Sequence, residues 1–320
     1  MSTHDAVDLA VSMEAAGFET AWFTEIEREP FVRCAAAISR TTRLRVGTGV
    51  ALWTRSPVTM AMTAAELHEL SNGRFTLGVG SGTAYANENV HNINFHRPVA
   101  RMAEYVDVVR GAWNSRDTPF DFEGDHFTVR GYGQPHFKSR PPLLLAAVGE
   151  RMLRLAAREA DGVILNPSTT PWYLSTHVLP QLAAGASQKG RSLSGFHRAL
   201  CLRCSVDSDR FSARERARLG IVEYGRYPIH QAQYSLYGFG REAAAISAAM
   251  AKGDTAAAVA SVGDDMVDTL GIAGTPDDVR RALSKWENIV DSVALMSPTF
   301  GLTTDEVRTN CSSIVETFAS

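Results

Sequence analysis

The sequence predicts an α/β fold with a parallel sheet, because short apolar strands alternate with helices of about ten or more residues. The length of 320 residues allows one large α/β barrel with insertions or two ordinary domains. No linker rich in Pro, Gly or Ser divides the chain. We therefore expect one domain over residues 1–320.

The chain opens with a helix, in which Val7, Ala10 and Met13 recur at helical spacing and Gly17 stands at a C-cap position. Thr275 is expected to cap a later helix, with proline and two acidic residues after it. Other helices are expected over residues 30–40, 57–70, 98–113, 151–160 and 172–186 and at the C-terminus. Strands are expected near residues 22, 48, 77, 145, 164, 203 and 294.

This order predicts a TIM-like (βα)8 barrel with insertions. Such a barrel needs eight strands, and the chain begins directly with a helix, so we expect it to lack the first N-terminal strand. Residues 118–141 are interpreted as an irregular insertion with a small hairpin around Gly124. Residues 210–270 are a second insertion, almost wholly helical apart from an aromatic, glycine-rich stretch from Tyr224 to Gly240.

Composition excludes several classes of protein. With 35 acidic and 32 basic residues the net charge is −3, which argues against nucleic acid as a partner. A membrane span needs roughly 18 apolar residues in a row, and the longest run, residues 141–149, is about half that length. The N-terminus has no basic region of a signal peptide. We expect a cytoplasmic protein.

The cysteines predict neither a disulfide framework nor a metal site. There are four of them, too few to staple a chain of this length. Cys201 and Cys204 form a CxxC pair within an expected strand, where residues three apart point to opposite faces. We interpret both as structural.

Three segments at the carboxyl ends of strands are candidate sites, because parallel sheets build active sites at that end. Gly78–Gly82 resembles a dinucleotide fingerprint, but a polar loop follows where a helix should begin. In Leu143–Gly149, small residues would admit a planar ligand and the next helix would offer free N–H groups to a phosphate. In Arg45–Pro57, glycines end a strand, and Arg55 is interpreted as a solvated residue beside the helix start, with an anion ligand as the alternative.

These segments together carry a family resemblance. The run from Glu66 to Ser81, ELHELSNGRFTLGVGS, resembles the commonest signature of the luciferase-like monooxygenase superfamily. TGVAL…RSPV before it and LLAAVGERMLRLAAREADGVI after it match the same superfamily in the same order. RPVARMAEY, the aromatic stretch and GTPDDV resemble its actinobacterial branch that depends on the deazaflavin coenzyme F420. The resemblance covers residues 5 to 297, nearly the whole chain.

The resemblance implies a barrel with F420, or alternatively FMN, at its carboxyl-terminal rim. Such enzymes have a cis, non-proline peptide against the ring, at positions that match Thr48, Gly49 and Val50. The loops that bind the cofactor phosphate in such enzymes match Ala147–Gly149 and Leu165–Asn166. The Ser81–Gly82 loop would flank the ring. The implied cofactor residues are Thr48, Gly49, Val50, Ser81, Gly82, Ala147, Val148, Gly149, Leu165 and Asn166.

Deazaflavin members of the superfamily pass a hydride to or from the ring while a nearby acid or base moves a proton. Glu25 stands where relatives often carry an acidic residue, so it is the candidate catalytic residue. His230 and Tyr234 are candidates for a substrate wall, with core packing as the alternative. The loop Ser81–His96 lacks the basic residues that relatives usually place there.

The sequence thus predicts an F420-dependent oxidoreductase that acts on a small organic substrate and forms a homodimer. A flavin-dependent monooxygenase on the same barrel, using FMN and oxygen, is the first alternative. A non-catalytic relative that has lost the cofactor is the second, and side chains that fill the space over Gly149 would indicate it.

Overall fold

A computed structural model describes residues 1–26, 28–115, 118–133 and 139–319. They form two units, each assembled from separate stretches of the chain. Unit 1 contains Met1–Gly17, Leu165–His177 and Arg198–Ser320, and unit 2 contains Phe18–Ile164 and Val178–His197. No linker marks the division, and the single domain stays a prediction.

Unit 2 is built on parallel strands in the order β1, β2, β4, β7, β8. The register pairs Thr20 with Arg45, Val46 with Phe75 and Leu77 with Leu143. The strands read as continuous apolar runs because both faces of a parallel sheet are covered. Their bounds are β1 Thr20–Phe23, β2 Arg45–Thr48, β3 Ala51–Leu52, β4 Phe75–Gly80, β7 Leu143–Ala147 and β8 Gly162–Leu165.

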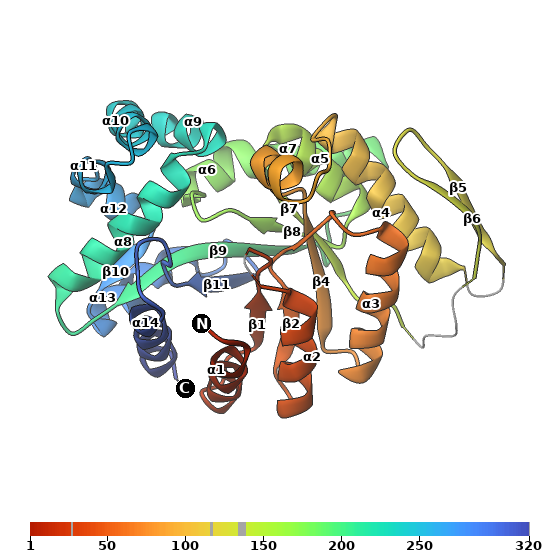
Figure 1. The fold of residues 1–320 in the computed structure, drawn as a ribbon, viewed down its shortest axis with the longest axis horizontal. Coiled ribbons are helices and arrows are strands. Elements are labelled where there is room, and N and C mark those ends of the chain that lie inside the picture. Colours follow the sequence, from red (N-terminus) through yellow and green to blue (C-terminus); the bar gives the residue numbers. More distant parts are fainter. Residues whose placement is uncertain (27, 116–117, 134–138, 320) are drawn as a thin grey trace. The chain divides into compact units, whose positions relative to one another are not determined.

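Helices of unit 2 run alongside these strands (Figure 1). Helix α3 packs on β4 and on α4, while α5 packs on β7 and α7. The bounds are α2 Pro30–Arg40, α3 Pro57–Leu70, the π-helix η1 Ala86–Val90, α4 Pro98–Asn114, α5 Glu150–Glu159 and α7 Leu179–Gln188. An antiparallel hairpin of β5 (Phe120–Glu123) and β6 (Thr128–Tyr132) confirms the one expected around Gly124. Residues 134–138 of that predicted insertion lie outside the described ranges.

Arg74 ties together the amino-terminal ends of β2 and β4. Its guanidinium donates to the carbonyl oxygens of Leu44 at 2.6 Å and Ser71 at 2.9 Å. It also donates to the carbonyl oxygens of Ile38 and Thr41, at the end of α2. The Gly-Arg-Phe part of the signature run is therefore a structural junction.

In unit 1 the long strand β9 (His197–Val206) pairs in parallel with β10 (Ile272–Gly274) and with β11 (Ser292–Met296). The helices of residues 210–270 enclose an apolar core of their own, which includes Ile221, Tyr234 and Met266. The remaining bounds are α1 Thr3–Ala15, α6 Pro171–Tyr173, the π-helix η2 Leu174–Val178, which ends in unit 2, α8 Arg210–Gly225, α9 Pro228–Leu236, α10 Gly240–Ala251, α11 Thr255–Ala260, α12 Asp264–Leu270, α13 Pro276–Leu283, the 3-10 helix η3 Ser284–Trp286 and α14 Thr304–Thr317.

Several local predictions are confirmed. Gly17 follows α1 with φ of 85°, a conformation that favours glycine. Thr275 caps α13 in a reciprocal capping box with Asp278. The first strand in the described ranges begins at Thr20, after helix α1.

Three sequence-based assignments are wrong. Strand β10 was not expected, because three residues carry almost no periodicity. The Tyr224–Gly240 stretch contains helix α9, which a proline at its first turn begins. The loop after Ser81 contains the π-helix η1, whose packing depends on the buried Asn87. Within the described ranges, no helix combines the length and apolarity that crossing a bilayer requires.

Candidate active site

Glu25 follows β1 and is held on three sides within unit 2. Its N–H donates to the Val50 carbonyl oxygen at 3.2 Å. Its carboxylate oxygen Oε2 accepts from the Leu52 N–H at 2.8 Å and pairs with the Arg55 guanidinium. The Glu25 side chain is 11% exposed, so its charge is fixed beside a cation with limited access to water.

Arg55 is a functional candidate for which the sequence interpretation preferred a solvated residue over an anion ligand. A second nitrogen of its guanidinium binds Glu29 Oε1 at 2.7 Å, and the group lies 5.1 Å from the centre of the Phe31 ring. The prediction of a solvated residue is wrong, because the two carboxylates reach Arg55 from the segment that joins β1 to α2. Arg55 counters the charge of Glu25 and limits its orientation.

The Thr48 side chain completes the sheet where β2 ends. Its Oγ1 donates to the Gly78 carbonyl oxygen at 2.7 Å and accepts from the Gly78 N–H at 2.9 Å. A Cβ on residue 78 would lie 2.1 Å from the Thr48 carbonyl oxygen, so only glycine fits there. The Thr48 hydroxyl, buried with the rest of its residue, is thus engaged by β4.

The next two residues depart from the strand. The Gly49–Val50 peptide bond is cis, as the resemblance implies. Gly49 N–H donates to the Phe23 carbonyl oxygen at 2.9 Å, and both residues are partly exposed. A Cβ on residue 80 would meet Val50 Cγ2 at 2.6 Å, so Gly80 leaves room for the Val50 side chain.

Asn87 organises the Ser81–Gly82 loop. Its Nδ2 donates to the carbonyl oxygens of Ser81 at 2.7 Å and Thr83 at 2.8 Å, while its Oδ1 accepts from Trp53 Nε1 at 2.6 Å. Asn87 is fully buried. Sequence periodicity could not predict this role of Asn87, because it depends on a tryptophan 34 residues away.

Arg101 and Tyr105 approach this cluster from α4. The Arg101 guanidinium lies 5.3 Å from the centre of the Trp53 ring. Tyr105 is fully buried, and among the described residues its hydroxyl has no hydrogen-bond partner. Burial raises the pKa of Tyr105 far above its ordinary value, so the hydroxyl keeps its proton.

The amino terminus of α5 is open to a ligand. Ala147 ends β7, Val148 is partly exposed, and Gly149 occupies the N-cap without a capping side chain. A Cβ on residue 149 would meet no atom within 4 Å. Uncapped N–H groups at a helix start favour an anion.

In unit 1 the segment after Leu165 is a tight polar turn. Asn166 Oδ1 accepts from the Ser168 N–H at 2.7 Å, and Leu165 is buried. The Ser168 carbonyl oxygen accepts from the Tyr237 hydroxyl at 2.7 Å. Asn166 is thus used partly to shape its own turn.

His230 is a buried, neutral imidazole in contact with this turn. Its Nδ1 lies 3.1 Å from Ser168 Oγ, and the Tyr224 ring meets it edge-on with the ring centres 4.9 Å apart. Burial and then the Arg203 charge lower the pKa of His230 to about 3. His230 can exchange hydrogen bonds but carries no charge near neutral pH.

Tyr234 packs inside the core of unit 1. It is fully buried, and its hydroxyl donates to the Ile221 carbonyl oxygen at 3.1 Å. We therefore assign it no contact with a substrate. Gln233 beside it is 3% exposed, and neither of its amide atoms has a partner among the described residues.

Arg203 is a buried cation that sequence reasoning missed. It is 1% exposed and donates to the carbonyl oxygens of Pro167 at 2.7 Å, Gly220 at 3.1 Å and Leu270 at 3.1 Å. Its guanidinium lies 4.5 Å from the centre of the Tyr224 ring. Arg203 thereby fixes the turn that carries Asn166.

Both thiols of the CxxC pair are free. Burial raises the pKa of Cys201 to about 11 and raises that of Cys204 further. Protonated buried thiols are inert, which agrees with a structural interpretation.

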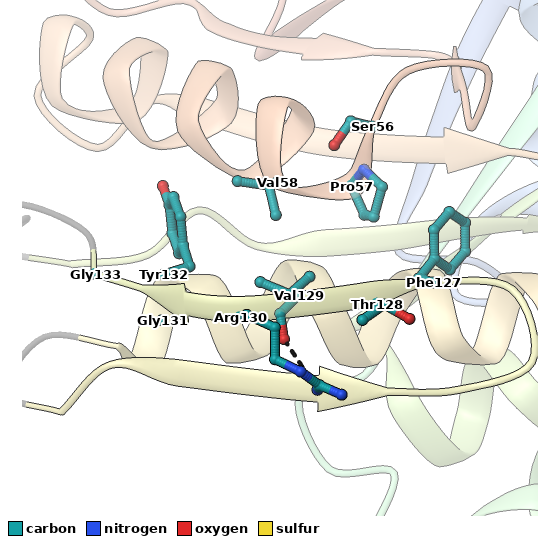
Figure 2. Close-up of a pocket in the computed structure, with 10 residues that line it drawn as sticks. All are labelled: Ser56, Pro57, Val58, Phe127, Thr128, Val129, Arg130, Gly131, Tyr132 and Gly133. Atoms are coloured by element: carbon teal, nitrogen blue, oxygen red, sulfur yellow. Dashed lines mark hydrogen bonds between the residues drawn. The ribbon is translucent and has the colours of Figure 1, made fainter.

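Unit 2 also has a groove of about 540 Å³ between strand β6 and the first turn of α3 (Figure 2). Ser56, Val58, Thr128 and Tyr132 are among its lining residues. None of the predicted site residues lines it, and we assign it no role in catalysis.

The sequence model of the luciferase-like monooxygenase family matches residues 1–292. The chain belongs to this family. A 5,10-methylenetetrahydromethanopterin reductase of Archaeoglobus fulgidus is 30% identical over 273 residues, which cover 83% of this chain and 81% of the relative.

Two solved structures show the luciferase-like fold of this chain. The coenzyme F420-dependent tetrahydromethanopterin reductase of Methanopyrus kandleri matches with a TM-score of 0.81 and 23% identity, over 99% of this chain and 96% of that one. A type II Baeyer–Villiger monooxygenase of Pseudomonas putida, solved with FMN, matches with a TM-score of 0.68 and 16% identity, over 99% and 92%. The predicted α/β, TIM-like barrel class is confirmed.

Luciferase-like relatives thus include enzymes of two cofactor classes. Within unit 2 the structure places Glu25, Thr48–Val50 and Ser81 around residues 50–53 and the end of β4. Within unit 1 it brings His230 to the Asn166–Ser168 turn.

Proposed function

We propose that this luciferase-like protein is an oxidoreductase that transfers a hydride between coenzyme F420 and a small organic substrate. The observation that carries the proposal is the partly buried Glu25–Arg55 pair beside the partly exposed residues Gly49 and Val50. The likeness to F420-dependent and methanopterin-reducing relatives supports the choice of a deazaflavin.

The residues present fit such a cofactor. A Cβ added at Gly149 would meet no atom of the described residues within 4 Å, which argues against a relative that has filled its cofactor site. Gly49, Val50, Ser81 and Gly82 of unit 2 would face the ring, and Val148 and Gly149 of the same unit would hold the phosphate. The contact of Asn166 with the cofactor stays a prediction. When bound, the deazaflavin supplies the carbon that accepts or gives the hydride.

The protein's own contribution is to bind, orient and exchange a proton. The Leu52 N–H and Arg55 hold the Glu25 carboxylate in one orientation, from which one oxygen can take or give a proton. His230, being neutral, would donate or accept a hydrogen bond at the substrate.

A flavin-dependent monooxygenase is the second candidate, favoured by the likeness to the FMN-containing structure. Titration of the purified protein with F420 and with FMN separates the two, because bound FMN absorbs near 450 nm and the deazaflavin absorbs to the blue of it. We expect tighter binding of F420. Tighter binding of FMN would favour the monooxygenase, and binding of neither would refute both.

A matched pair of glycine variants tests the phosphate position. Gly149→Val should weaken cofactor binding about tenfold or more, because its side chain covers the helix start. Gly133→Val is the control. Gly133 follows β6, and a Cβ added there also meets no atom of the described residues within 4 Å. Equal affinity of the two variants would contradict the assignment.

The role of Glu25 is tested by measuring the rate at which the enzyme, loaded with F420, turns over a panel of small alcohols and carbonyl compounds. Glu25→Gln should lower it about a hundredfold or more, with cofactor affinity kept, whereas Glu29→Gln should change it little. The homodimer and the cytoplasmic location stay predictions, which light scattering and cell fractionation test.

A further inference from the structure

Unit 1 has a cavity of about 370 Å³ that none of the predicted site residues lines. The start of α6, strand β9, the end of α9 and the segments around β10 and η3 contribute to its walls. We call it the aromatic cavity and define it by Trp172, Leu202, Leu236, Tyr237, Lys285 and Trp286, which line it with seven further residues. Its volume is that of a small-molecule site.

The walls of the aromatic cavity offer flat apolar surface to a ligand. Trp172 is 48% exposed and Leu236 is 51% exposed, although both are large apolar side chains. The Trp172 and Tyr237 rings meet edge to face at 82°, with their centres 6.1 Å apart. A planar ring placed against them would cover apolar surface and gain aromatic contacts.

The charge at the cavity favours an anion. The Asp268 carboxylate is already countered by Arg214, whose Nη1 lies 2.7 Å from Asp268 Oδ1. Lys285 is exposed, and its ammonium forms no ion pair with any residue that the structure describes. Arg214 also pairs with Asp264, so Lys285 is the charged group of the lining that an anionic ligand could engage.

The aromatic cavity lies next to the turn that carries Asn166. Thr170 lines it, and the Tyr237 hydroxyl donates to the Ser168 carbonyl oxygen at 2.7 Å. A ligand there would therefore lie against the same segment of unit 1.

We propose that the aromatic cavity is a second small-molecule site, which binds a flat aromatic carboxylate with its ring against Trp172 and Tyr237 and its carboxylate at Lys285. No bond is made or broken in this binding. The proposal does not depend on the proposed function, because it needs neither cofactor nor turnover.

Calorimetric titration of the full-length protein without cofactor tests it, with benzoate as the probe. Benzamide keeps the ring without the charge, and cyclohexanecarboxylate keeps the charge without the flat ring. We expect benzoate to bind with a dissociation constant of about 1 mM or tighter, and each of the other two to bind at least about threefold more weakly. Equal binding of all three, or of none, overturns the proposal.

Matched variants locate the binding. Lys285→Met should weaken benzoate about fivefold and leave benzamide unchanged, while Trp172→Ala should weaken both up to about tenfold. Lys252→Met and Phe211→Ala remove an exposed lysine and an exposed aromatic ring outside the cavity and should change nothing. Benzoate binding that survives both cavity variants overturns the proposal, and circular dichroism of each variant verifies its fold.

Discussion

Thr48→Val tests whether one hydroxyl completes the sheet of unit 2. Valine has nearly the shape of threonine but cannot bond to Gly78, whose N–H and carbonyl groups lose their partner at 2.9 Å and 2.7 Å. Leaving a buried polar group unpaired costs about 1–3 kcal/mol. With two groups affected and partial relaxation, we expect the free energy of unfolding to fall by about 3 kcal/mol.

Thr48→Ser is the matched control, because it keeps the hydroxyl and removes only a methyl group. Its expected cost is about 1 kcal/mol. Urea unfolding followed by circular dichroism measures both variants in the protein without cofactor, and equal slopes establish that the midpoints can be compared. A loss below about 1 kcal/mol for Thr48→Val, or equal losses for the two, would refute the reasoning.

Three further predictions concern buried groups. Tyr105→Phe removes a hydroxyl that lacks a hydrogen-bond partner in the described structure and should raise the free energy of unfolding by about 1 kcal/mol. A decrease of about 1 kcal/mol instead would indicate that the hydroxyl does form a hydrogen bond. The His230 imidazole should show no NMR titration between about pH 5 and 8, and stability should fall as pH drops below about 6.5, where only the unfolded state takes the proton; a midpoint near 6.5 would contradict its burial. Burial raises the pKa of Asp161, but hydrogen bonds from Arg140 and the Leu143 N–H and the nearby guanidinium charges outweigh this and hold it below its ordinary value. Asp161→Asn should therefore lower urea midpoints near pH 7 and flatten their decline below about pH 4, where the unfolded-state carboxylate takes up its proton before the native one does; an unchanged acid profile would argue against it.

Much of the fold could be predicted because local patterns encode it. Continuous apolar runs identify strands such as Leu143–Ala147, and capping residues such as Thr275 locate helix starts. These signals lie within a few residues of the element that they specify. Strand β10 lacked such a signal, because it is three residues long and owes its conformation to pairing with Cys204–Val206.

The candidate site was only partly predictable because its contacts are distant in sequence. The positions of Glu25 and Gly149 at strand ends could be expected from strand order. The Arg55–Glu25 pair joins residues 30 apart, and Arg203 reaches Leu270 across 67 residues. No pattern in a single sequence states which arginine meets which acceptor, so the contacts of Arg55, Asn87 and Arg203 emerged only from the structure.

The arginine of the signature run has a bearing on how this family is recognised. Arg74 binds four carbonyl oxygens around the amino-terminal ends of β2 and β4, whereas Glu25 and Ser81 follow the carboxyl ends of their strands. In this chain the arginine of the signature run therefore serves folding rather than chemistry. Loss of Arg74 should reduce the yield of folded protein without altering which molecules the folded protein binds.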